Sequence, residues 1–195
     1  MVTMPEVHRV GGLIGAELRG LDLTRVYEDE TYEAVLRAWA EYGVIFFRDQ
    51  HLDAEQRDAF ASRLGEIRVR QELRKDPEQT KAIGEGWHTD MTCLDEPPKA
   101  TILFCEEVPP RVLYVNPEFT TRFEGWTRRE SLPLLRYLFD FGVRPEFTTR
   151  FRWAPGSIAM WDNRQTWHFA VNDYQGQRRV MHRILLAGSK PIPAA

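Results

Sequence analysis

The sequence predicts a mainly β fold, a sandwich or barrel, with flanking helices. From Pro98 onward, short runs with strand character alternate with turn-forming residues, as in Ala154-Pro155-Gly156 and in 172–176. Aromatic residues make up 12% of the chain and there are 12 prolines, which suits many short strands joined by turns. Such a pattern is typical of sandwiches and barrels. The expected strands cover residues 100–105, 112–115, 147–153, 157–161, 166–171 and 180–187.

The first third of the chain predicts a helix followed by a buried strand. Residues 31–42 carry an apolar stripe at helical spacing, formed by Tyr32, Val35, Leu36 and Trp39. Gly43 is expected to end this helix, because glycine readily adopts the backbone conformation found just past a helix end. The apolar run 44–47 then predicts the strand.

Two further helices are expected. One begins at Asp53, because Gln56 three residues later completes a capping box, and it ends at Gly65. The other covers residues 131–139, with Pro133 tolerated in its first turn. We expect residues 1–195 to form a single domain, since a chain of this length can bury a core of its own.

Charge and composition exclude several classes of protein. Lys and Arg number 26 against 29 Asp and Glu, a net charge of -3 that offers no basic surface for nucleic acid. The apolar runs are far too short to cross a bilayer, and the N-terminal residues lack the pattern of a signal peptide. The two cysteines, Cys93 and Cys105, have no close C-x-x-C spacing. We therefore expect a cytoplasmic protein without a membrane or nucleic-acid partner.

Two histidines and one aspartate suggest a metal site. In an extended chain His88 and Asp90 point to the same side, so one nitrogen and one oxygen are offered to a single ion. His168, on an expected strand, supplies a second imidazole. Two histidines and a carboxylate form the facial triad of non-haem iron(II) oxygenases, which leaves coordination positions open for other ligands. The same set can hold catalytic zinc, and His-x-Asp alone is more often a polar surface patch.

Two arginines follow on the last expected strand. Arg179 and Arg183 are four residues apart, so they share a face with Met181. Guanidinium groups suit bidentate recognition of carboxylates, and two of them on an inner face need an anion to neutralise them. The functional interpretation is a pocket for organic anions. The plainer interpretation is a solvated edge strand.

The chain resembles the taurine dioxygenase family, which includes alkylsulfatase and aryloxyalkanoate dioxygenases. The resemblance covers nearly the whole chain, with both metal-bearing segments in the family's order and a basic strand after the second. The segments that carry it are Ile14–Glu17, Gly20–Leu23, Gly43–Arg48, Trp87–Thr92, Pro97–Leu103, Pro155–Arg164, His168 and Gln177–Arg183.

This resemblance implies a fold and roles for individual residues. The family fold is a double-stranded β-helix, a cupin-like jelly roll with flanking helices. By position, His88, Asp90 and His168 would bind iron(II), and Arg179 would bind the distal carboxylate of 2-oxoglutarate. Arg183 would lie nearer the iron, beside the cosubstrate and any anionic substrate group. The match also places Phe119 near the substrate, and Trp87, Asp162, Asn163 and His182 in structural or supporting positions.

The resemblance also implies the reaction and its partners. With Fe(II), 2-oxoglutarate and O2, the enzyme would hydroxylate a small organic acid of the sulfonate, alkyl sulfate or aryloxyalkanoate class. The cosubstrate would leave as succinate and CO2. Relatives are commonly homo-oligomers, either dimers or tetramers. Two alternatives stay open: a cupin-like metal enzyme that is independent of 2-oxoglutarate, and a non-catalytic jelly-roll binding module.

The sequence departs from the family at two points. The family's Gly-Gly-Asp-Thr segment, whose Thr contacts 2-oxoglutarate, has no counterpart where Pro110 meets Arg111. A second compression falls within residues 66–71. We expect the natural protein to carry loop segments near 66–71 and 110–111 that this sequence lacks.

Overall fold

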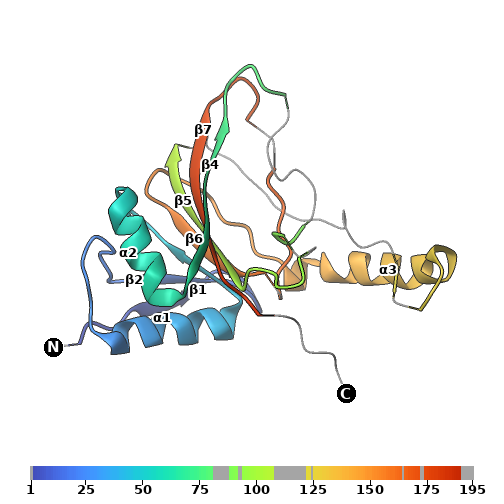
Figure 1. The fold of residues 1–195 in the computed structure, drawn as a ribbon, viewed down its shortest axis with the longest axis horizontal. Coiled ribbons are helices and arrows are strands. Elements are labelled where there is room, and N and C mark those ends of the chain that lie inside the picture. Colours follow the sequence, from blue (N-terminus) through green and yellow to red (C-terminus); the bar gives the residue numbers. More distant parts are fainter. Residues whose placement is uncertain are drawn as a thin grey trace.

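The computed structural model describes residues 2–80, 88–91, 94–107, 122–123, 125–163, 165–171 and 174–189. Figure 1 shows a sheet with helices on both sides. Its elements in chain order are β1 (Glu6–Arg9), β2 (Ala16–Arg19), α1 (Asp29–Tyr42), β3 (Val44–Phe47), α2 (Ala54–Leu64), β4 (Ile67–Lys75), β5 (Ala100–Glu107), α3 (Arg128–Gly142), a 3-10 helix (Pro145–Phe147), β6 (Ile158–Asp162) and β7 (Arg179–Leu186). None of the helices in the described ranges is long and apolar enough to span a membrane.

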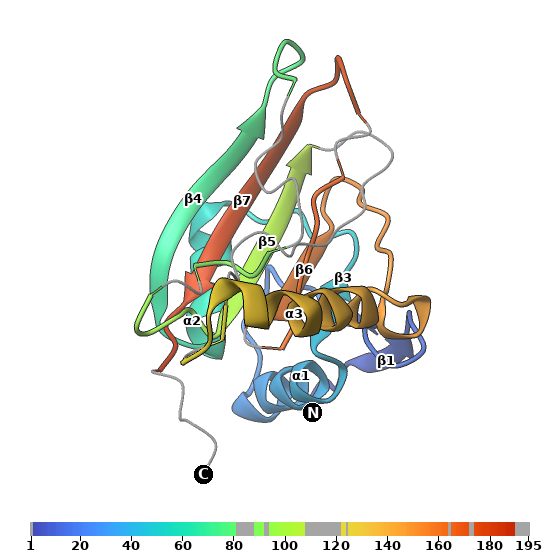
Figure 2. The ribbon, with the colours of Figure 1, turned by 90° about the vertical axis from the view of Figure 1, so that its right-hand side faces the viewer.

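The strands form one seven-stranded sheet in the order β1-β2-β3-β6-β5-β7-β4. β2 and β3 are parallel, and the other neighbouring strands are antiparallel (Figure 2). The strands are covered by α2 on one side, while α3 lies across the other side (Figures 1 and 2). We call the side that faces α1 and α2 the outer face, and the side that faces α3 the inner face.

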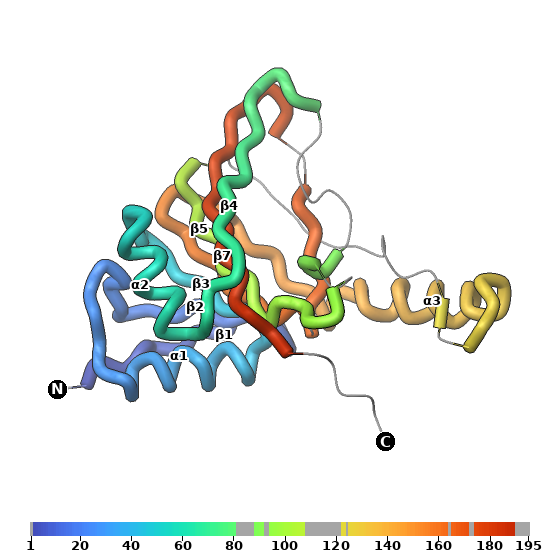
Figure 3. Tube along the Cα trace, in the orientation of Figure 1, coloured from blue at the N-terminus to red at the C-terminus, as the bar shows by residue number. Residues whose placement is uncertain are grey.

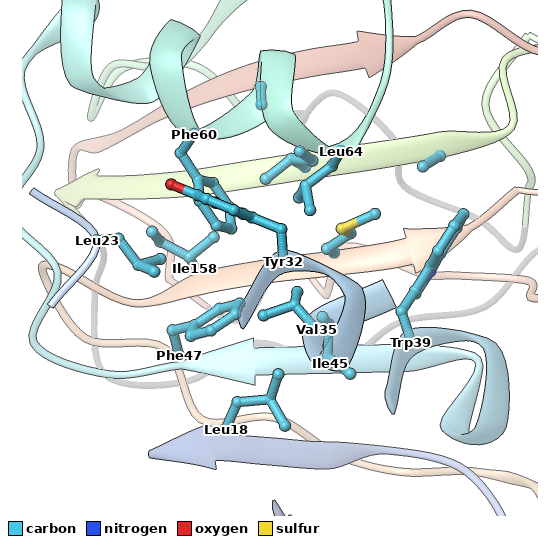
Figure 4. Close-up of a cluster of buried hydrophobic side chains, with 14 of the residues drawn as sticks. Leu18, Leu23, Tyr32, Val35, Trp39, Ile45, Phe47, Phe60, Leu64 and Ile158 are labelled. Carbon is cyan, nitrogen blue, oxygen red and sulfur yellow. The ribbon is translucent and has the colours of Figure 1, made fainter. Parts of the chain in front are cut away.

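The main apolar core lies on the outer face. Strand alternation places Ile45 and Phe47 of β3 against the helices, whereas Val44 and Phe46 pack on the inner face. Phe47 is fully buried and makes an edge-to-face contact with Phe60 of α2, with ring centroids 5.8 Å apart (Figure 4). This packing anchors α2 to the sheet and leaves the inner face for a second group of residues.

The first two helices confirm their predicted ends. Gly43 follows α1 with φ 69, a conformation that favours glycine, and its N–H donates to the carbonyl of Trp39. Asp53 caps α2: its carboxylate accepts from the backbone N–H of Gln56, and the Gln56 side chain accepts from the Asp53 N–H. Strand β3 has the predicted bounds.

The third helix is longer than predicted. α3 begins at Arg128 after a capping box formed by Thr127 and Glu130, so Pro133 lies beyond the first turn. The prediction for Pro133 is therefore wrong. The capping pair lies upstream of the apolar residues from which the helix was predicted, and these residues alone do not mark its start.

Two predicted strands are wrong and three strands were missed. Residues 147–153 begin within the 3-10 helix and then form no strand, and in 166–171 only His168 makes a bridge. The strand expected at 112–115 lies outside the described residues. The unpredicted strands are β1, β2 and β4, of which β1 is exposed along its whole length and β4 has few buried positions. Such strands lack the continuous apolar run on which the prediction relied.

Candidate metal centre

The three predicted ligands meet on the inner face of the sheet. His88, Asp90 and His168 offer ligand atoms that all lie within 4.8 Å of one another. Nε2 of His88 is 3.6 Å from Oδ1 of Asp90, and Nε2 of His168 is 3.4 Å from Oδ2. Asp90 and His168 are buried and His88 is half-buried. The arrangement brings two imidazoles and one carboxylate to one point.

A backbone bridge sets the spacing of the two imidazoles. His88 donates to the carbonyl of His168 at 3.0 Å, and His168 donates to the carbonyl of His88 at 2.9 Å. The two rings lie 4.2 Å apart between centroids. Figure 3 shows the segment 88–91 beside the segment around residue 168, on the side of the sheet that faces α3. Paired backbones therefore bring together ligands that are distant in the sequence.

A hydrogen-bond chain from β5 holds the carboxylate. Thr101, fully buried on β5, donates from Oγ1 to Oδ2 of Asp90 at 2.7 Å. Nδ2 of Asn163 donates to Oγ1 of Thr101 at 2.9 Å, and Oδ1 of Asn163 accepts from Nε1 of Trp161 at 3.0 Å. Asn163 thus has the predicted supporting position. Thr101 was not predicted as a site residue, because its only signal in the sequence is a polar residue within an apolar strand.

Arg183 contacts the other carboxylate oxygen. Its Nη1 donates to Oδ1 of Asp90 at 2.7 Å, and its Nη2 donates to Oε1 of Gln71 on β4 at 2.5 Å. His182, the next residue back along β7, pairs instead with Glu106. Arg183 therefore lies beside the predicted metal position, and its positive charge offsets the negative charge of Asp90.

The surroundings favour a charged carboxylate and a neutral imidazole. Burial would raise the pKa of Asp90, but hydrogen bonding to His88 and Thr101 and the charge of Arg183 hold it below its ordinary value. For His168, burial lowers the pKa well below its ordinary value, and electrostatic interaction with His88, Arg183 and Arg179 lowers it further. A charged carboxylate and neutral imidazoles are the forms that bind metal.

Arg179 lies four residues from Arg183 on the same strand and the same face. Its side chain is buried, with only 6% exposed, and its Nε has no hydrogen-bond partner among the described residues. A buried guanidinium without a full set of partners is costly unless an anion joins it. Its position is inconsistent with a solvated edge strand, since β7 lies between β5 and β4.

The comparisons with known proteins identify the family. The profile of the taurine catabolism dioxygenase TauD, TfdA family matches residues 6–112 and 110–185. The chain belongs to this family. An alpha-ketoglutarate-dependent sulfate ester dioxygenase from Pseudomonas putida is 29% identical over 274 positions, covering 96% of this chain and 91% of the relative. An alkylsulfatase from Acinetobacter baylyi is 27% identical over 270 positions, covering 94% and 85%.

A solved structure agrees with the family assignment. The crystal structure of a taurine dioxygenase from Burkholderia xenovorans has a TM-score of 0.83 and 29% identity, over 95% of this chain and 91% of that chain. The predicted fold class, a mainly β jelly roll with flanking helices, is confirmed. The chain is an Fe(II)- and 2-oxoglutarate-dependent dioxygenase that uses O2, the first of the functions raised from the sequence.

The donor set of this TauD/TfdA-family chain fits iron(II). Two neutral imidazole nitrogens and one carboxylate oxygen suit a six-coordinate ion that keeps positions open. Both Asp90 oxygens accept hydrogen bonds, Oδ2 from Thr101 and Oδ1 from Arg183, and carboxylates that bind metals are usually supported in this way. The residues present are therefore compatible with the family's metal.

An apolar cavity adjoins the candidate metal centre of the dioxygenase. Its volume is about 520 Å3, and it lies between β3, β6 and α3 on the inner face. His168 is part of its wall, and Trp161 packs against the His168 ring with centroids 4.6 Å apart. Aromatic and aliphatic side chains line most of the rest, among them Phe46, Phe151 and Ala159. Phe119, expected near the substrate, lies outside the described residues.

Proposed function

We propose that this chain hydroxylates a small organic acid at an iron(II) ion bound by His88, Asp90 and His168. The observation that carries the proposal is the convergence of these three side chains, with ligand atoms within 4.8 Å of one another. Iron(II) with 2-oxoglutarate and O2 supplies the oxidising chemistry, in which the cosubstrate becomes succinate and CO2 as a substrate C–H bond is hydroxylated. The protein supplies ligand geometry, orientation and exclusion of water.

Two arginines are proposed to position the anionic groups. Arg183 already contacts Asp90, so its guanidinium lies where it can reach an anion beside the metal. Arg179 is buried on the same face and suits the distal carboxylate of 2-oxoglutarate. Guanidinium groups recognise carboxylates through paired N–H donors, which fixes orientation as well as charge.

We further propose that the substrate carries an apolar alkyl or aryl group near its acid group. The apolar cavity beside His168 supports this, because it offers apolar surface within reach of the metal. The names of two relatives, a sulfate ester dioxygenase and an alkylsulfatase, point to organic sulfate esters as the first candidates. Sulfonates and aryloxyalkanoates complete the panel of substrates to be tested.

Succinate release measures this activity directly. We expect one or more members of the panel to trigger succinate formation by the Fe(II)-loaded protein. His168→Ala and Asp90→Ala should abolish it, because each removes a metal ligand. His182→Ala is the matched control, since His182 pairs with Glu106 and lies outside the cluster. Substrate-triggered turnover that survives in either ligand variant would contradict the proposed site.

We infer that the natural protein has additional loops near residues 66–71 and 110–111. The alignment with the P. putida relative supports this, because it runs over 274 positions while the chain has 195 residues. The family profile also matches in two parts that meet at 110–112. An intact mass above 22.8 kDa for the natural protein would support the inference, and a matching mass would contradict it.

The assembly and location of the protein are proposals from the sequence. We propose a homo-oligomer, a dimer or tetramer, located in the cytoplasm. Cys105 is a free, buried cysteine, which suits a reducing compartment. Light scattering coupled to size exclusion measures the subunit number, and a monomer at micromolar concentration would contradict the first proposal.

A further inference from the structure

A second buried cation lies opposite Arg179. Lys75, the last residue of β4, pairs in register with Arg179, the first residue of β7. Directly opposite residues of an antiparallel pair point to the same face. The next pair on that face, Leu73 and Met181, belongs to the apolar cluster of the inner face. Both cations therefore face the interior that holds the candidate metal centre.

The Lys75 ammonium has no anionic partner among the described residues. The residue is only 3% exposed, and its Nζ makes no hydrogen bond in the described part of the chain. Within the described residues Nζ lies over the ring of Tyr174, 4.8 Å from its centroid. A buried ammonium is costly unless it is paired and hydrogen-bonded, and a cation–π contact offsets only part of that cost.

Among the residues that the structure describes, the neighbouring side chains do not neutralise the two cations. Burial raises the pKa of the Cys105 thiol to about 12, so the sulfur near Arg179 is uncharged. Asp76 and Glu107 lie close in sequence and register, but they pair with Arg74 and Arg178. Lys75 and Arg179 thus form an adjacent pair of buried cations. A carboxylate between them could accept hydrogen bonds from both.

The position of Arg179 along β7 indicates which carboxylate of the cosubstrate would bind between Arg179 and Lys75. Arg183 contacts Asp90, whereas Arg179 and Lys75 lie four residues further along, about 13 Å at the usual rise of a strand. A dicarboxylate whose first carboxylate lies near the metal would extend its second one toward this pair.

We propose that Lys75 joins Arg179 in binding the distal carboxylate of 2-oxoglutarate, as a second cationic group at that end of the cosubstrate. The proposal rests on the proposed function, because it takes the metal centre and Arg179 as its reference points. It assigns to Lys75 a role in cosubstrate recognition, with no part in the chemistry of the iron.

Calorimetric binding to the Mn(II)-loaded protein tests the proposal without turnover. Two ligands are compared: 2-oxoglutarate and 2-oxopentanoate, which keeps the metal-binding end and lacks the distal carboxylate. Lys75→Met retains the length of the stem and removes the charge. We expect it to weaken 2-oxoglutarate binding about tenfold or more, the loss typical of one charge-assisted contact, with 2-oxopentanoate binding unchanged.

Controls separate this proposal from a structural role. Lys99→Met removes a lysine that donates to the carbonyl of Leu64, and both ligands should bind it as they bind the parent protein. Lys75→Arg should restore 2-oxoglutarate binding in part. If Lys75→Met does not fold, Lys75→Gln takes its place in the same comparison.

Two results would overturn the proposal while the proposed function stands: unchanged 2-oxoglutarate affinity in Lys75→Met, or equal weakening of both ligands. A parent protein that binds Mn(II) but neither 2-oxo acid would overturn it as well. Failure of the parent protein to bind Mn(II) would overturn the proposed function, and the inference with it.

Discussion

Thr101 donates a hydrogen bond of 2.7 Å to Oδ2 of Asp90 from the start of the apolar strand β5, where it is the second residue. The hydroxyl is fully buried, so its partner is fixed by the fold and not shared with solvent. Asn163 donates to the same hydroxyl, which leaves the Thr101 proton to point at the carboxylate. The orientation of Asp90 is thus set from β5 as well as from its own segment.

Thr101→Val should weaken metal binding with little change of fold. Valine has nearly the shape of threonine but cannot donate, so one Asp90 oxygen loses its partner. We expect the affinity for Mn(II) or Co(II) to fall about 10- to 100-fold, as is typical when a supporting partner of a ligand is removed. Thr101→Ser keeps the hydroxyl and is the matched control. Equal metal affinity in Thr101→Val and the parent protein would show that the hydrogen bond has no such role.

Ala159→Leu should change which substrates are accepted. Ala159 on β6 is buried and lines the apolar cavity, so a larger side chain there fills part of that space. We expect kcat/KM for organic acids with long apolar groups to fall about tenfold or more, while short ones are spared, because pocket contacts of this size are worth about 1–3 kcal/mol. Succinate release across a chain-length series gives the ratio. A uniform loss for all lengths would indicate damage to the metal centre.

Asp53→Ala should destabilise the protein through α2. The substitution removes the capping box, a change that costs about 1 kcal/mol. For a chain of this size the melting temperature should fall by about 2–4 °C. Asp53→Asn retains a good cap and should keep most of the stability. Thermal unfolding followed by circular dichroism measures both, and an unchanged midpoint in Asp53→Ala would contradict the assigned cap.

Cys105 should resist alkylation in the folded protein. Burial raises the pKa of its thiol to about 12, so almost no thiolate forms at pH 8, and the thiolate is the reactive form. We expect iodoacetamide to leave the Cys105 peptide unmodified in native protein and to label it in denaturant. Mass spectrometry of that peptide separates it from Cys93. Rapid native labelling would show that the strand opens or that the thiol is exposed.

The sequence predicted the elements that have strong local signals. The capping pair of Asp53 and Gln56 marked the start of α2, and Gly43 marked the end of α1. Both signals arise from hydrogen bonds and backbone angles within a few residues, so they survive whatever packs around them. The structure also brings the three metal-ligand candidates together, and their assignment as ligands stays a prediction.

Tertiary contacts determine the features that were not predicted correctly from the sequence. The aromatic and polar alternation of 147–153 imitates a strand, yet Phe151 and Trp153 line the cavity without strand partners. β4 was missed because most of its side chains are exposed, although pairing with β7 holds it in the sheet. The burial of Lys75 depends on that same pairing, and no pattern in its own segment signals it.

The reciprocal backbone bond between His88 and His168 has a consequence for how such enzymes vary. Two main-chain hydrogen bonds join His88 and His168 directly. The distance between their rings therefore does not depend on the length of the chain between them. Insertions and losses in that interval can then change what covers the cavity and leave the ligand set intact. Substrate specificity and metal binding are therefore separable properties. The specificity can diversify between related enzymes while the metal ligands are kept.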